Sequence, residues 1–244
     1  MFITCTISEF LKTCESYEFD ANALKDFIDK ISHVKQHIST PHKESAVLTG
    51  STIPLILISS KRYNTYTYGD IDIFCSDNTY KTYRPIKLSE LEPVLTASSK
   101  FNKAIYKDKD NDTININTGL KYDSAQELLL TFDYSIIMIA IHIFEDKVVY
   151  WHSALDDIKA RQLIMPSKTM IFDAMILKHF ALKSFKRLSK YSNRGFSLSK
   201  EDYNYLADII TDNSIDIPPD SEPHDYIFKV SGKDILTVLT GINL

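Results

Sequence analysis

Glycine, cysteine and long apolar runs are all scarce in this chain of 244 residues. Only 6 residues are glycine and 3 are cysteine, and the cysteines show neither CxxC nor Cys/His ligand spacing. We therefore expect reduced thiols in an intracellular protein. Lysine, isoleucine and asparagine are abundant, which is typical of an AT-rich genome and carries no information about activity.

Membrane and secretion signals are also absent from the sequence. No apolar run reaches the ~20 residues that a membrane-spanning helix needs. The first ten residues, MFITCTISEF, are polar and lack the basic start of a signal peptide. These features predict a cytoplasmic protein without a membrane partner.

The charge balance excludes a general attraction to nucleic acid. The formal net charge is −4, with 44% hydrophobic and 25% charged residues, as in an ordinary globular protein. Binding to a polynucleotide would therefore require a local basic patch. The length is sufficient for one large domain or two small ones, and the sequence contains no internal repeat.

The most informative stretch is 46–74, AVLTGSTIPLILISSKRYNTYTYGDIDIF. A strand at its end carries Asp70 and Asp72, and residues two apart on a strand share a face. Two neighbouring carboxylates repel each other, and a hard divalent cation such as Mg²⁺ relieves that repulsion. The pattern predicts a site for Mg²⁺ or Mn²⁺.

The turn at Gly50 and Ser51 precedes this strand along the chain. Glycine permits a tight turn, and its backbone N–H groups together with the Ser51 hydroxyl are suited to hold a phosphate. A phosphate-binding turn followed by a metal-binding Asp-x-Asp predicts a site that handles nucleotides.

A third carboxylate is predicted at Asp133, within the apolar stretch 128–143, LLLTFDYSIIMIAIHI. This stretch is rich in β-branched residues and predicts one or two central strands. A lone ionisable group in a buried strand is costly unless it is paired or bound to metal. A turn-capping role remains an alternative, and we favour the metal role because Asp70 and Asp72 call for a partner.

A helix predicted over 169–191 continues toward Arg194 and contains no acid after Ala174. Its basic residues fall opposite an apolar stripe formed by Leu177, Ala181, Phe185 and Leu188. Such a face is commonly only solvated, but its single sign of charge makes it a candidate phosphate-binding or polynucleotide-binding face. The candidate nucleotide-binding residues are Lys186, Arg187, Lys190 and Arg194.

Gly50-Ser51 followed by Asp70-Ile71-Asp72 resembles the nucleotidyltransferase superfamily with its polymerase-beta-like fold. The pattern of that superfamily is Gly-Ser, a spacer, Asp-x-Asp and a third acid on a later strand. The resemblance implies an α+β fold in which a mixed β-sheet packs with helices and a helical C-terminal part follows. The spacer between Ser51 and Asp70 is longer than is usual in the superfamily.

A second resemblance extends over residues 46–196. It is to phage and viral nucleotidyltransferase-like proteins, which would place the chain in a host cytoplasm. The positions that carry it are Phe132-Asp133, Trp151-His152, Asp156-Asp157-Ile158 and the helix end Arg187 to Phe196, RLSKYSNRGF.

These features predict two regions and one activity. Residues 1–150 would form the nucleotidyltransferase-like core with an N-terminal helix, and residues 151–244 a helical region packed on it. The activity would be metal-dependent transfer of a nucleoside monophosphate from an NTP to a hydroxyl, with release of pyrophosphate. The acceptor would be an RNA 3′ end, such as that of a tRNA, or a protein.

The alternative is a catalytically inactive module of the same fold that binds RNA or a host protein, and the long spacer after Ser51 favours it slightly. The three acids favour the enzyme. The sequence leaves the base, the acceptor and the oligomeric state open.

Overall fold

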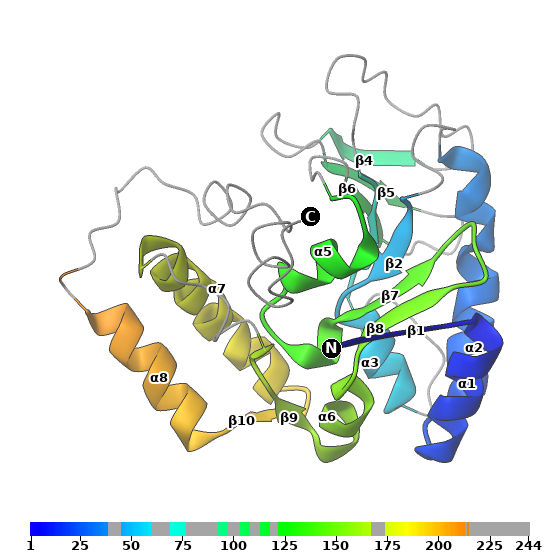
Figure 1. The fold of residues 1–244 in the computed structure, drawn as a ribbon. Coiled ribbons are helices and arrows are strands. Elements are labelled where there is room, and N and C mark those ends of the chain that lie inside the picture. The colour runs from blue at the N-terminus through cyan, green and yellow to red at the C-terminus, as the bar shows by residue number, and fades with distance from the viewer. Residues whose placement is uncertain are drawn as a thin grey trace. The chain divides into compact units, whose positions relative to one another are not determined.

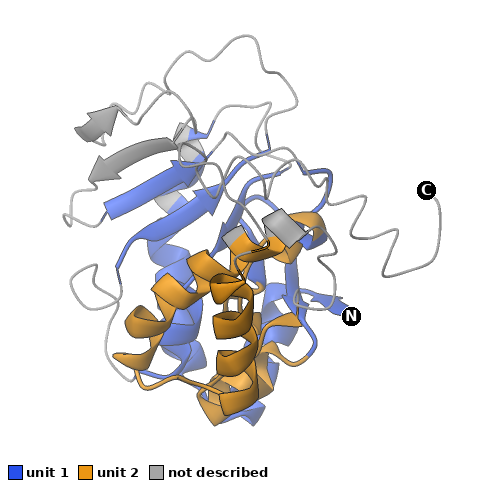
Figure 2. Ribbon diagram, turned by 90° about the vertical axis from the view of Figure 1, so that its left-hand side faces the viewer, with its two compact units in different colours: residues 1–126, 139–152 blue, residues 127–138, 153–244 orange. Residues whose placement is uncertain are grey.

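The computed structural model describes residues 1–38, 45–59, 69–76, 92–96, 103–107, 113–117, 122–166, 174–212 and 214. The chain divides into two units, coloured separately in Figure 2. Unit 1 comprises Met1–Gln126 and Ile139–His152, and unit 2 comprises Glu127–Met138 and Ser153–Leu244.

Unit 1 contains an eight-stranded sheet with the strand order β1-β8-β7-β2-β3-β6-β5-β4 (Figure 1). Neighbouring strands are antiparallel except for β3 and β6, which are parallel. The sheet is therefore mixed, as the sequence predicted. The strands are β1 (Phe2–Cys5), β2 (Val47–Thr49), β3 (Ile71–Phe74), β4 (Glu92–Thr96), β5 (Lys103–Lys107), β6 (Thr113–Asn117), β7 (Ile139–His142) and β8 (Val148–Trp151).

The helices of unit 1 begin with clear capping signals. Thr6 and Glu9 form a reciprocal capping box at the start of α1 (Ile7–Ser16). Asp20 accepts from the Ala23 N–H at the start of α2 (Ala21–Ile31). In place of the single predicted N-terminal helix there are two, because Glu18 adopts a left-handed φ of 62° between α1 and α2. The described residues between α2 and β3 also form η1 (Ser32–His37) and α3 (Thr52–Leu57).

One face of the sheet is apolar near its centre. Leu48, Ile73 and Ile116 are register partners on β2, β3 and β6, and all three are fully buried. Leu48 lies with Ile28 and Ile31 of α2 around a cavity of about 200 Å³, so this face packs beneath the helices. Because side chains alternate along a strand, the neighbouring residues point to the opposite face.

The stretch 128–143 differs from its prediction. Its first residues lie in helix α5 (Ala125–Leu130), and the short 3₁₀ helix η3 (Ser135–Ile137) follows. Only β7 is a strand, so the prediction of strands is wrong for the segment that carries Asp133. The apolar run indicates that the segment is buried, but a buried helix and a buried strand can both have such a run.

Unit 2 is mainly helical in its described part, as the C-terminal region was predicted to be. Ser153 directly precedes α6 (Ala154–Ala160), and its hydroxyl donates to Asp157, 2.8 Å away. Helices α7 (Ala174–Ser192) and α8 (Lys200–Thr211) pack against each other. The short strands β9 (Gln162–Leu163) and β10 (Ser197–Leu198) pair in parallel.

The first part of the predicted helix 169–191, residues 169–173, falls outside the described residues. Among the helices that the described residues form, none has the length and apolar character required to cross a membrane.

Candidate nucleotide and metal site

Gly50 makes the turn between β2 and α3 and brings the backbone close to Asp72. Its φ is +97°, a conformation that residues with a side chain rarely adopt. A Cβ atom on Gly50 would lie only 3.2 Å from Oδ2 of Asp72. Glycine is therefore required here both for the backbone conformation and for the space beside the carboxylate.

The two predicted acids lie at the start of β3, next to this turn. Asp70 directly precedes the strand and is exposed, whereas Asp72 lies within it and is half-buried. Asp72 pairs in register with Thr49, the last residue of β2. The hydroxyl of Thr52 donates to the backbone carbonyl of Asp70 at 2.8 Å, which ties the first turn of α3 to this acid.

Asn115 of β6 joins the two acids, and sequence reasoning missed it. It pairs in register with Asp72 across the parallel β3–β6 ladder and is 1% exposed. Its Nδ2 donates to Oδ2 of Asp70 at 2.8 Å and to Oδ1 of Asp72 at 3.0 Å. The signal in the sequence is the alternation TININ, in which Asn115 stands between two buried isoleucines.

These three side chains suit a divalent cation. Because one nitrogen lies within hydrogen-bond distance of both carboxylates, the two acids converge on one point. A positive charge at that point would be attracted by both carboxylates. Carboxylate and amide oxygens are ligands that Mg²⁺ and Mn²⁺ prefer. Within the described part of unit 1, no third His, Cys, Asp or Glu side chain completes a metal-binding group with the two acids.

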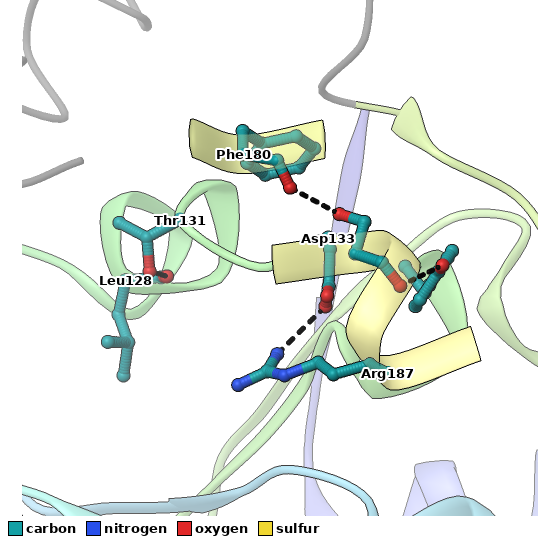
Figure 3. A network of polar contacts seen from close by, with 7 residues as sticks. Leu128, Thr131, Asp133, Phe180 and Arg187 are labelled. Atoms are coloured by element: carbon teal, nitrogen blue, oxygen red, sulfur yellow. Dashed lines mark hydrogen bonds and ion pairs between the residues drawn. The ribbon is translucent and has the colours of Figure 1, made fainter. Parts of the chain in front are cut away.

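Asp133 belongs to unit 2, where it forms an ion pair. Its carboxylate is fully buried, and Oδ1 accepts from Nη1 of Arg187 at 3.0 Å (Figure 3). Oδ2 is buried without a hydrogen-bond partner among the described residues. The acid lies between α5 and η3 instead of on a strand. Its catalytic and metal-binding role stays a prediction.

Hydrogen bonds hold the neighbourhood of Asp133 against α7. The hydroxyl of Tyr134 donates to the carbonyl of Ser184, and the hydroxyl of Ser184 donates to the carbonyl of Phe180, both at 2.9 Å. On the same helix, burial and the nearby positive charge of Arg187 lower the pKa of Lys183 to about 8, against an opposing effect of Asp133.

The basic residues of α7 have different environments. Lys186 and Lys190 are exposed, Arg187 is engaged with Asp133, and Arg194 is half-buried, so that burial lowers its pKa. The nucleotide-binding role predicted for these four residues stays a prediction.

The buried face of α7 differs from the predicted apolar stripe. Phe185 is 38% exposed and lies against Tyr203 of α8, with 5.7 Å between their ring centroids. Of the predicted stripe, Ala181 is fully buried, and among the α7 side chains that the structure describes Phe180, Ser184 and Tyr191 are buried with it.

The structure is similar to solved structures of CCA-adding enzymes. The match to the Thermotoga maritima CCA-adding enzyme complexed with tRNA-CCA has a TM-score of 0.52 and 16% identity, and covers 100% of this chain and 58% of that enzyme. A CCA-adding enzyme in complex with ATP matches with a TM-score of 0.52 and 15% identity, over 98% of this chain and 55% of the other. A tRNA-processing enzyme in its apo form matches with a TM-score of 0.53 and 17% identity, and the match covers 88% of this chain and 56% of that enzyme.

No protein-family model matches the sequence, and none of the curated proteins matches it. The structural likeness, at these identities, concerns the fold. It confirms the predicted α+β class with a nucleotidyltransferase-like mixed sheet. The chain spans little more than half the length of the three enzymes.

We expect Gly50→Ala to destabilise the protein more than the matched variant Gly195→Ala. Both glycines have a positive φ, so each substitution costs about 1–2 kcal/mol in backbone conformation. At Gly195 the new Cβ would meet its nearest neighbour at 3.6 Å, an ordinary contact, whereas at Gly50 it would press on Asp72. Chemical denaturation measures both losses, and equal losses would show that the approach to Asp72 imposes no constraint.

For the buried ion pair, we expect Arg187→Met to cost about 3 kcal/mol of unfolding free energy, because it leaves Asp133 buried and unpaired. Asp133→Asn should cost only about 1 kcal/mol, because Arg187 is 38% exposed and can be rehydrated. The double variant should be more stable than Arg187→Met alone. Urea titration without metal measures all three, and a gain in stability for Asp133→Asn would instead indicate a carboxylate that awaits a cation.

Proposed function

We propose that the chain is a metal-dependent nucleotidyltransferase that transfers a nucleoside monophosphate from an NTP to a hydroxyl group. The observation that carries the proposal is the convergence of Asp70 and Asp72 on one point, next to the Gly50 turn. The similarity of the fold to CCA-adding enzymes supports it.

The divalent cation would be held by Asp70 and Asp72. When bound, Mg²⁺ or Mn²⁺ would supply charge neutralisation for the triphosphate and lower the pKa of a coordinated hydroxyl. Gly50 and Ser51 would contact the β- and γ-phosphates through backbone N–H groups and the serine hydroxyl. Asp133 keeps its predicted role as a third acid in this proposal, and its substitution is part of the test below.

The reaction forms one bond and breaks one bond at the α-phosphorus. The acceptor oxygen attacks the α-phosphorus, and the bond from that phosphorus to the oxygen bridging to the β-phosphorus breaks. Pyrophosphate leaves with the bonding electron pair, and the proton of the acceptor hydroxyl passes to solvent beside the exposed Asp70. The backbone N–H groups at Gly50 and Ser51 would help to stabilise the developing negative charge.

The proposed acceptor is the 3′ end of an RNA such as a tRNA, with a protein side chain as the alternative. One of the similar structures contains tRNA-CCA and another contains ATP, which supports an NTP donor and an RNA acceptor. Lys186 and Lys190 are exposed on α7 and would attract the phosphates of the RNA, together with Arg187 and Arg194.

A catalytically inactive module that binds RNA or a host protein is the second candidate. It is favoured by the neutral Asn115, which already satisfies both acids by hydrogen bonding without a metal. We retain the resemblance to phage and viral proteins, and with it a host-cytoplasmic location, as part of the proposal.

A labelling experiment tests the activity. The protein is incubated with each α-³²P-labelled NTP, Mg²⁺ or Mn²⁺, total RNA and a protein lysate, and the products are resolved on a gel. We expect label on a discrete RNA band, and a loss of at least 100-fold in Asp70→Asn and Asp72→Asn because each removes a metal ligand. Asp133→Asn tests the predicted third acid in the same way.

Asp29→Asn is the matched control for labelling, because Asp29 is an exposed acid on α2 and forms an ion pair with the exposed Lys25. Circular dichroism establishes that each variant is folded. If the wild-type protein labels an acceptor and both Asp70→Asn and Asp72→Asn retain that labelling, the assigned site is wrong. An absence of label and of metal-dependent NTP binding would favour the inactive module.

The basic face gives a separate expectation for RNA binding. Lys186→Ser combined with Lys190→Ser should weaken the binding of bulk tRNA and reduce the slope of log K against log[salt] by about 1.5, because two phosphate contacts are lost. Filter binding between 50 and 200 mM salt measures the slope. Lys12→Ser, an exposed lysine of α1, is the control, and an equal change there would exclude a specific role for α7.

A further inference from the structure

Asn115 occupies an unusual position for an amide side chain. It is 1% exposed, and one nitrogen serves both carboxylates of the proposed metal site. A hydrogen bond to a charged acceptor is stronger than one between neutral groups. The amide therefore offsets part of the repulsion between Asp70 and Asp72, a task that a cation would perform more completely.

The other end of the same amide has no such compensation. Oδ1 of Asn115 is buried and has no hydrogen-bond partner among the described residues. An unpaired buried acceptor costs about 1–3 kcal/mol. The amide group that bridges the two acids through its nitrogen thus also carries an oxygen without a hydrogen-bond partner among the described residues.

We propose that Asn115 is a further protein ligand of the divalent cation, in addition to the proposed acids, an inference that rests on the proposed function. Rotation of the amide by half a turn about its Cβ–Cγ bond exchanges Oδ1 and Nδ2. The oxygen then faces the point on which both carboxylates converge, and amide oxygens are suitable ligands for Mg²⁺ and Mn²⁺. Because Nδ2 takes the former place of Oδ1, the number of unpartnered polar atoms on Asn115 does not increase.

The ligand set has a consequence for charge. Asp70 and Asp72 contribute two negative charges and the amide contributes none, so a single divalent cation neutralises the set. A carboxylate at position 115 would add a third negative charge, which would strengthen cation binding but increase the repulsion in the metal-free protein. Substitution of Asn115 therefore changes metal affinity and metal-free stability in opposite directions.

The test measures Mn²⁺ binding without nucleotide, by the electron paramagnetic resonance signal of free Mn²⁺ and by the midpoint of thermal unfolding. Asn115→Leu removes both polar atoms and keeps the branched shape of the side chain, and Asn115→Asp replaces the amide by a carboxylate of the same size. Asn117→Leu is the matched control, because Asn117 lies two residues further along β6 and its side-chain amide donates to the Ile73 carbonyl, at 3.4 Å. Asp72→Asn reports on the metal site itself.

We expect Mn²⁺ to raise the unfolding midpoint of the wild-type protein. Asn115→Leu should weaken Mn²⁺ binding about tenfold, in the range known for supporting groups of metal sites. Asn115→Asp should lower the midpoint without metal, bind Mn²⁺ about tenfold more tightly, and recover more stability when metal is added. Asn117→Leu should bind Mn²⁺ like the wild-type protein.

Three outcomes would overturn the inference, and they are distinguishable. Wild-type affinity in Asn115→Leu, together with lost binding in Asp72→Asn, would exclude Asn115 as a ligand and leave the proposed function intact. No Mn²⁺ binding by the wild-type protein would overturn both. If Asn115→Leu does not fold, Asn115→Asp decides the question, because unchanged or weaker Mn²⁺ binding in that variant contradicts a ligand at this position.

Discussion

Repulsion between two carboxylates is the constraint on which the candidate site depends. Asp70 and Asp72 are brought together by the local geometry of β3, and the sheet must supply what makes their proximity tolerable. It does so on both sides of β3, where β2 leads into Gly50 and leaves space for Asp72, while β6 provides the amide of Asn115. The strand order β2-β3-β6 is therefore what allows the acids to coexist.

The sequence was sufficient to identify the features that are local. The acids and the glycine turn follow from residues that are close in the chain and from strand periodicity, and the α+β class was implied by the resemblance that these residues carry. Asn115 was not predictable, because it is 43 residues away from Asp72 and meets it only through the parallel pairing of β3 with β6. A single sequence does not show which strands become neighbours. An asparagine is also a weaker sign of a metal site than an acid, because its side chain is neutral.

The segment around Asp133 shows the opposite limit of sequence patterns. An uninterrupted apolar run indicates burial, but α5, η3 and β7 all satisfy it with different backbones. The prediction that the buried acid needs a partner is consistent with the structure, since Arg187 pairs with it from α7. The sequence could not choose between an arginine and a metal, because both compensate the same charge and Arg187 is 54 residues away.

The division of the chain also affects how it folds during synthesis. Three times the backbone passes from one unit to the other, at 126–127, 138–139 and 152–153. β1 at residues 2–5 finds its partner only when β8 at 148–151 has left the ribosome, so the sheet cannot close until the first segment of unit 2 exists. Such distant pairings slow folding and leave strand edges exposed meanwhile. The emerging chain therefore presents an unfinished sheet, and we expect it to need protection from chaperones before the last helices appear.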